Sequence, residues 1–296
     1  MIRTIFLTAF ALAAFAFNSI LCRLALRGDE ADAAGFTAVR LISGAITLIA
    51  ISLLLPELLQ RSARKQGRNT QHLRFAKGGS WLSAFWLAAY AICFSFAYLN
   101  LTAGTGALIL FGSVQLTMIL ISLGKGERPT GLEWLGLLIA LGGLVYLVLP
   151  GLAAPPLNSS LLMAAAGASW GFYTLRGKGS SDPLSDTTGN FVKTLPFVIA
   201  LVVIFYLNIH LTSRGIFLAV LSGAVASGIG YTVWYAALKH HTATRAAILQ
   251  LAVPIIAAAG GVLFMAEEFT TRLLIAGALV LGGIGMTIAG RKKKIR

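Results

Sequence analysis

Ten apolar runs, each about the length of a membrane-crossing helix, dominate the chain. They cover residues 4–26, 34–56, 79–99, 104–124, 132–149, 159–177, 187–209, 215–238, 244–265 and 273–290. A helix needs about 20 apolar residues to cross a hydrocarbon core about 30 Å thick. Only 11% of the 296 residues are charged, against about 25% in soluble domains, and this excludes a soluble globule. The sequence predicts an all-α integral membrane protein with ten transmembrane helices.

The basic residues indicate how this bundle is oriented. With ten spans both termini lie on one side, and 18 of the 24 Lys and Arg residues fall at the termini or in loops of that side. Four fall on the opposite side, and two lie inside spans. Basic residues collect on the cytoplasmic side of membranes, so we expect a multi-pass protein of the inner (cytoplasmic) membrane with both termini cytoplasmic. The net charge of +14 then indicates anionic lipid headgroups rather than nucleic acid as a partner.

The two halves of the chain resemble each other. Three offsets bring similar residues together in the same order. An offset of 153 residues matches Phe17–Arg23 with Trp170–Arg176 and Val39-Arg40 with Val192-Lys193. An offset of 137 residues matches Phe94 with Tyr231 and Tyr98 with Tyr235, and one of 140 residues matches Glu127 with Glu267 and Thr130 with Thr270. This predicts a first five-helix repeat at 1–150 and a second at 151–296, the latter including a basic cytoplasmic tail. Because five is odd, the second repeat is inverted, an architecture typical of secondary transporters.

These features together resemble the drug/metabolite transporter superfamily, EamA type. The resemblance rests on Phe17-Asn18 with Arg23, Trp170-Gly171 with Arg176, the Val39-Arg40 pair, Pro254 and the two Glu-x-x-Thr motifs. In the first half, Val114 occupies the position that matches Pro254, so this half departs from the family pattern. The resemblance implies export of small organic solutes, commonly amino acids or related metabolites, with the aromatic amino-acid exporters as the preferred branch.

Several kinds of chemistry lack the residues that they need. No Asp or Glu lies within the interior of a predicted span, which argues against a buried carboxylate proton relay. No phosphate-binding loop for ATP and no metal-ligand spacing occurs, so we expect no cofactor, no metal and no enzyme activity. Facilitated diffusion or exchange by alternating access is the simpler mechanism. The alternatives are a multidrug, organic-cation or nucleotide-sugar-type carrier of the same superfamily and, more remotely, an intramembrane enzyme or a channel.

Arg40 and Lys193 are the two cations inside spans, and they match each other in the repeat. A charge at the bilayer centre costs at least about 2.5–3.5 kcal/mol, so such residues usually face a cavity. Either one could bind a substrate carboxylate or phosphate. The alternative is that their long side chains reach the headgroups.

Aromatic and amide side chains supply the remaining candidates for substrate binding. Helical spacing places the aromatic residues in stripes on three spans, and either a pocket or helix packing explains them. Asn18, Gln115 and Gln250 must find partners inside the bundle or read a substrate. Pro254 is a candidate gate because proline bends helices. We expect a small-molecule substrate and a monomer or weak homodimer. The aromatic candidates are Tyr90, Phe94, Tyr98, Trp170, Tyr173, Tyr231, Trp234 and Tyr235.

Overall fold

A computed structural model describes residues 2–64, 78–124, 130–148, 154–177, 180–238, 249–250 and 252–290. Within these ranges the protein is built from helices, and one isolated bridge joins Ala31 to Leu211. The helices are α1 (Ile2–Arg27), α2 (Ala33–Arg64), α3 (Trp81–Ala97), α4 (Ala103–Gly124), α5 (Gly131–Val148), α6 (Leu157–Gly177), α7 (Pro183–Lys193), α8 (Leu195–Phe205), η2 (Tyr206–Asn208), α9 (Ser213–Val220), η3 (Leu221–Ile229), α10 (Gly230–Leu238), α12 (Ala252–Met265) and α13 (Thr271–Gly290).

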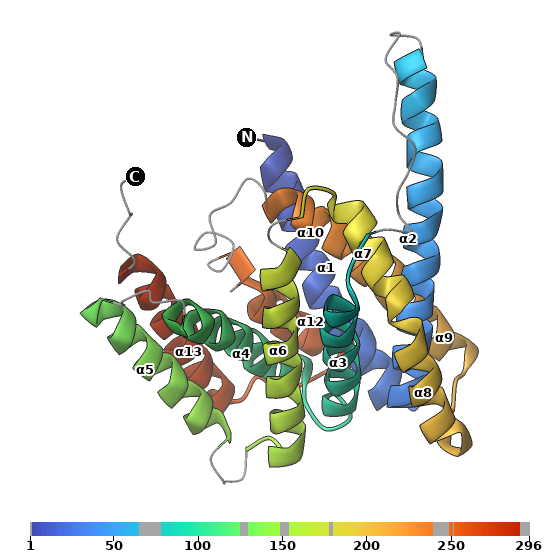
Figure 1. Cartoon of the computed structure of the whole chain (residues 1–296). Helices are drawn as coiled ribbons and strands as arrows, with labels where there is room; N and C mark the ends of the chain where they lie inside the picture. Colours follow the sequence, from blue (N-terminus) through green and yellow to red (C-terminus); the bar gives the residue numbers. More distant parts are fainter. Residues whose placement is uncertain are drawn as a thin grey trace.

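These helices confirm the all-α membrane fold and correspond to the ten predicted spans. By length and composition, four described stretches can cross a bilayer: Thr4–Arg27, Ala33–Leu54, Pro183–Asn208 and Ser213–Leu238. Five of the other spans are shorter apolar helices. α2 continues past its predicted end and projects beyond the bundle (Figure 1). The predicted start of the ninth span, the basic residues from Lys65 to Lys77, Glu127 and the tail 291–296 lie outside the described residues.

Two spans of the second half are not continuous α-helices. The seventh span breaks at Thr194, between α7 and α8, where Pro196 occupies the first turn of α8. A proline there lacks an N–H that the helix start would leave unbonded in any case. In the eighth span the nine-residue π-helix η3 joins α9 to α10. The hydropathy pattern of residues 215–238 does not predict this π-helix.

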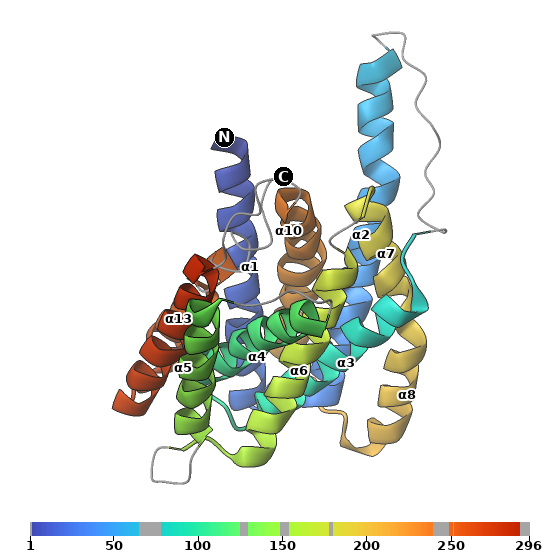
Figure 2. The same cartoon turned by 60° about the vertical axis from the view of Figure 1, so that its left-hand side comes forward.

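The helices pack as expected for two inverted copies of one unit. Three pairs join a span to its counterpart in the other half: α2 with α7 and α8, α4 with α12, and α5 with α13. The contact of α3 with α6 is matched by that of α1 with η3 and α10, and the contact of α4 with α6 by that of α1 with α12. α1 runs down the view and its counterpart α6 runs up (Figures 1 and 2). The centre of the molecule therefore lies between the two halves.

Small residues allow close packing around this centre. A Cβ atom added to Gly171 would lie 3.1 Å from Cγ2 of Thr117 on α4, and one added to Gly223 would collide with the carbonyl oxygen of Arg40 on α2. η3 thus lies directly against α2. This contact determines which side chains of η3 meet Arg40.

Candidate functional site

Arg40 lies at the centre of the bundle and is 1% exposed. Its Nε donates to the hydroxyl of Ser227 at 3.1 Å, and its Nη2 donates to the hydroxyls of Tyr90 at 3.1 Å and Tyr231 at 2.9 Å. The guanidinium also lies over the ring of Phe94, with Cζ 4.9 Å from the ring centroid. These partners come from both halves of the chain. The side chain therefore points into the bundle rather than toward the headgroups.

The charge of Arg40 is not balanced by a carboxylate within the described part of the chain. The ion pairs there are Arg23–Glu267 and Arg214–Glu30, and neither includes Arg40. Its Nη1 is buried and has no hydrogen-bond partner among the described residues. An uncompensated buried charge is strongly destabilising. A ligand with a negative charge would remove that penalty.

The hydroxyls of the two tyrosines that bind Arg40 also contact each other. The hydroxyl of Tyr231 donates to that of Tyr90 at 3.3 Å, so Tyr90 accepts from both Arg40 and Tyr231. A phenol has one proton to donate, and the proton of Tyr90 is not used in these two bonds. Nη1 of Arg40 and the hydroxyl of Tyr90 are thus two neighbouring donors that a carboxylate could accept from.

The π-helix η3 explains why Ser222 and Ser227 meet the same amide. Both hydroxyls donate to Oδ1 of Asn18, at 2.7 and 3.2 Å. In an α-helix, residues five apart point about 140° away from each other, whereas a π-helix closes its bonds over five residues. Nδ2 of Asn18 donates to the Tyr231 hydroxyl at 3.5 Å. Asn18 therefore belongs to the Arg40 network, as its place among the sequence candidates suggested.

Aromatic rings form one wall beside this polar network. Phe15 packs edge-on against Trp170, Tyr231 and Trp234, at centroid distances of 5.7, 5.8 and 5.5 Å. Trp170 lies 4.6 Å from Tyr231 and 5.0 Å from Tyr90. Both indole N–H groups, of Trp170 and Trp234, are buried without a partner among the described residues. The wall is apolar but retains unused donors.

A small cavity opens between the aromatic wall and the polar network. The space open to a water-sized sphere is about 10 Å³, enough for about one water molecule. The lining residues are Phe15, Asn18, Tyr90, Leu110, Phe111, Trp170 and Tyr231. Arg40 is not among them, but it donates to the hydroxyls of Tyr90 and Tyr231, which are. The central space is therefore nearly closed in this conformation.

The remaining candidates lie around the cavity rather than in its lining. The Tyr98 hydroxyl donates to the carbonyl oxygen of Ala103 at 3.3 Å, and the rings of Tyr173 and Tyr235 are 6.0 Å apart. Gln115 and Gln250 are buried elsewhere in the bundle. Pro254 lies in the first turn of α12, so it does not bend the described part of that helix. Its predicted role as a gate stays a prediction.

Lys193 does not share the environment of Arg40. Its Nζ donates to the carbonyl oxygens of Gly78 at 2.7 Å and Gly79 at 3.1 Å, in the segment that precedes α3. It is partly exposed, and neither glycine lines the cavity, whereas Tyr90 and Tyr231, the partners of Arg40, do. Its placement gives no support to a role in substrate binding. The two matched cations of the repeat have separate surroundings.

Three residues of the site were missed by the sequence analysis: Phe15, Ser222 and Ser227. The motif had drawn attention to Phe17, which is 46% exposed and faces away from the site. Phe15 lies three residues before Asn18, a spacing that puts the two side chains on one helix face. That spacing was the available signal. For the two serines the Gly- and Ser-rich composition of 221–229 was the available signal, because such sequence tolerates irregular helix geometry.

Comparisons with known proteins show the family of this chain. The EamA-like transporter family matches residues 157–289. An uncharacterized protein of Pseudomonas aeruginosa is 47% identical over 289 residues, which are 98% of this chain and 96% of that protein. The chain belongs to the EamA-like transporter family. The expected EamA-type drug/metabolite transporter is therefore confirmed, and the protein is a multi-pass membrane transporter.

More distant relatives of this EamA-like transporter carry transporter names. An uncharacterized transporter of Archaeoglobus fulgidus is 24% identical over 217 residues, 71% of this chain and 76% of that protein. A probable amino-acid metabolite efflux pump of Escherichia coli is 24% identical over 222 residues, 69% of this chain and 73% of that protein. A crystal structure with a TM-score of 0.63 and 18% identity covers 97% of this chain and 98% of its own and has the same fold.

Proposed function

We propose that this EamA-like transporter exports small carboxylate-bearing solutes, foremost amino acids with aromatic or apolar side chains. The observation that carries the proposal is the buried, uncompensated guanidinium of Arg40 beside an aromatic wall. A guanidinium binds carboxylates through paired N–H donors. The relative from Escherichia coli is named for the efflux of amino-acid metabolites, which agrees with this solute class.

The geometry suggests how such a solute is held. Its carboxylate accepts from Nη1 of Arg40 and from the Tyr90 hydroxyl, the two donors left over by the network. Its side chain lies against Phe15 and Trp170, and its ammonium group meets the faces of the lining aromatic rings. An organic cation would instead be repelled by Arg40. A phosphate would satisfy the same guanidinium, so a phosphate-bearing solute is the alternative that the Arg40 contacts also allow.

We propose alternating access between the repeats 1–150 and 151–296, with the central cavity as the solute site. The cavity lining contains no Asp, Glu or His among the described residues. Solute binding therefore need not move a proton, which favours facilitated diffusion or exchange. The basic residues support a cytoplasmic location of both termini in the inner membrane. Export then runs from the face of the termini to the opposite face.

Counterflow in proteoliposomes tests this function. Vesicles are loaded with unlabelled phenylalanine, leucine, glutamate or phenethylamine, and uptake of labelled phenylalanine is followed. We expect phenylalanine and leucine inside to stimulate uptake, because carriers exchange solutes across the membrane. Glutamate adds a charge and phenethylamine lacks the carboxylate, so both should stimulate little uptake. Equal stimulation by phenethylamine, or no counterflow with any amino acid, would contradict the proposal.

A further inference from the structure

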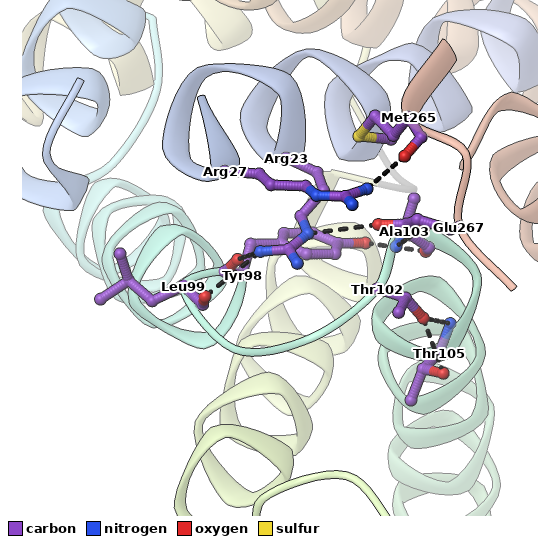
Figure 3. A network of polar contacts seen from close by, with 9 residues as sticks. All are labelled: Arg23, Arg27, Tyr98, Leu99, Thr102, Ala103, Thr105, Met265 and Glu267. Atoms are coloured by element: carbon purple, nitrogen blue, oxygen red, sulfur yellow. Dashed lines mark hydrogen bonds and ion pairs between the residues drawn. The ribbon is translucent and has the colours of Figure 1, made fainter. Parts of the chain in front are cut away.

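Two arginines and a glutamate join four helix ends at the end of α1 that lies far from the N-terminus (Figure 3). Nε of Arg23 contacts Oε1 of Glu267 at 3.2 Å, and Nη1 of Arg23 donates to the carbonyl oxygens of Tyr98 at 2.9 Å and Leu99 at 3.2 Å. Oε2 of Glu267 accepts from the backbone N–H of Ala103 at 2.8 Å. Arg27 donates to the carbonyl oxygen of Met265. We call this group the Arg23–Glu267 clasp.

Each charge of the clasp meets a helix end of opposite polarity. Arg23 binds carbonyl groups at the C-terminus of α3, and Glu267 binds the first N–H of α4. Cations are favourable at helix C-termini and anions at helix N-termini. The two charged side chains are also mostly buried, 14% and 6% exposed. Such contacts hold the four helix ends together more firmly than an exposed ion pair would.

The backbone before Glu267 is shaped for this contact. Ala266 has a φ of 48°, a left-handed conformation that non-glycine residues seldom adopt. The turn brings the N–H of Glu267 to the carbonyl oxygen of Gly261 at 3.1 Å and its carboxylate back toward α4. A strained turn persists where surrounding contacts determine it.

A small apolar cluster lies beside the clasp. Ile20, Ala103 and Met265 form this buried cluster, and the Tyr98 hydroxyl donates to the carbonyl oxygen of Ala103. Along α1, Arg23 is five residues beyond Asn18, about 7.5 Å at 1.5 Å per residue, and points about 140° away from it. The clasp therefore lies beyond the level of the cavity, toward the end of α1 that is far from the N-terminus.

The clasp also connects the two halves of the chain. α1, α3 and α4 belong to the first half and α12 to the second. A rocking motion that separates α12 from α1 and α4 breaks the ion pair and the Ala103 contact. We propose that the Arg23–Glu267 clasp is the gate that closes the solute route on the face opposite the termini, and that this conformation has that gate shut. The inference rests on the proposed route through the central cavity.

Cys22 offers a reporter for this gate that needs no transported solute. Its side chain is 0% exposed, and it follows Asn18 by four residues on the same face of α1. Cys93 is the other cysteine and is replaced by Ala to give a single-thiol protein. In vesicles of known orientation, a membrane-impermeant maleimide is applied from one face at a time. The rate of Cys22 labelling is compared among single-thiol proteins that differ at one position.

The decisive variant is Glu267→Gln, and Glu268→Gln is its matched control because Glu268 is an exposed neighbour on the same loop. We expect Glu267→Gln to speed labelling at least tenfold from the face opposite the termini and not from the other face, with Glu268→Gln at the parent rate. Arg23→Lys, which keeps the charge but loses the forked contacts, should give a smaller increase and replaces Glu267→Gln if that variant does not fold.

Three results would overturn the gate. The first is an unchanged rate of Cys22 labelling in the folded Glu267→Gln protein, or in Arg23→Lys if that variant takes its place. The others are an equal increase of the labelling rate in Glu268→Gln, or an equal increase from both faces of the membrane. If labelling behaves as expected while counterflow fails with every amino acid, the gate stands and the solute class falls. If counterflow succeeds while labelling does not change, the solute class stands and the gate falls.

Discussion

Arg40 and Lys193 occupy matching places in the two sequence repeats, yet the fold gives them different surroundings. Arg40 meets hydroxyls from both halves and no carboxylate among the described residues, whereas Lys193 caps two backbone carbonyls before α3. The difference arises in the surrounding helices. α2 is continuous past Arg40, while the seventh span breaks directly after Lys193.

Under the proposed function, this contrast lets an inverted repeat carry a single binding site. The two halves share one arrangement of helices, as the symmetric packing shows. The polar network is not duplicated. It forms where one cation of the first half meets the π-helix and tyrosine of the second half.

Replacement of the two cations should give the largest difference. Arg40→Gln removes charge-assisted contacts worth about 1.5–3 kcal/mol, which corresponds to a loss of about ten- to hundredfold in affinity for a carboxylate-bearing solute. Lys193→Gln should change affinity less than about twofold. The affinity is measured as the half-saturation concentration of counterflow, with folding checked by size-exclusion profile. Equal losses in both variants would mean that the repeat positions are functionally equivalent after all.

The tyrosine hydroxyls should have a smaller effect. Tyr231→Phe removes one acceptor of Arg40 and the hydrogen bond to Tyr90, a neutral contact worth about 0.5–1.5 kcal/mol, or about two- to twelvefold in affinity. Tyr206→Phe is the matched control because its side chain is exposed on η2. If Tyr231→Phe transports with native affinity, the hydroxyl network is structural and does not position Arg40 for a ligand.

The aromatic wall should affect selectivity more than overall affinity. Phe15→Leu removes a ring that packs against four other rings and should reduce the preference for phenylalanine over leucine by about two- to twelvefold, since aromatic pairs contribute about 0.5–1.5 kcal/mol. Phe17→Leu alters an exposed ring on the same helix and should leave the preference unchanged. Competition between phenylalanine and leucine in counterflow measures this preference. An equal change of the preference in both variants would place the aromatic wall outside the solute site.

The sequence predicts the spans well because hydropathy and length alone decide which segments cross a bilayer. It also marks Arg40 and Lys193 as the two cations inside apolar runs, but it does not place Arg40 ahead of Lys193. It cannot predict the partners of Arg40, because the register of Ser222 and Ser227 depends on the π-helix that packs against α2. Phe15 escapes notice because one more phenylalanine in an apolar helix carries no signal of its own.

Lys193 shows the opposite failure. The offset of 153 residues equates it with Arg40, but the break at Thr194 gives the end of α7 a different environment. The repeat boundaries at 150 and 151, the orientation in the membrane and the oligomeric state stay predictions.

The central claim, that Arg40 binds the solute carboxylate, is tested most directly by a four-way affinity measurement. Binding of phenylalanine and of phenethylamine, which lacks only the carboxylate, is measured by calorimetry on the native protein and on Arg40→Gln. We predict that Arg40→Gln weakens phenylalanine at least tenfold and leaves phenethylamine unchanged or slightly tighter, because only the first ligand loses a charge partner. An equal effect of Arg40→Gln on both ligands would contradict the claim.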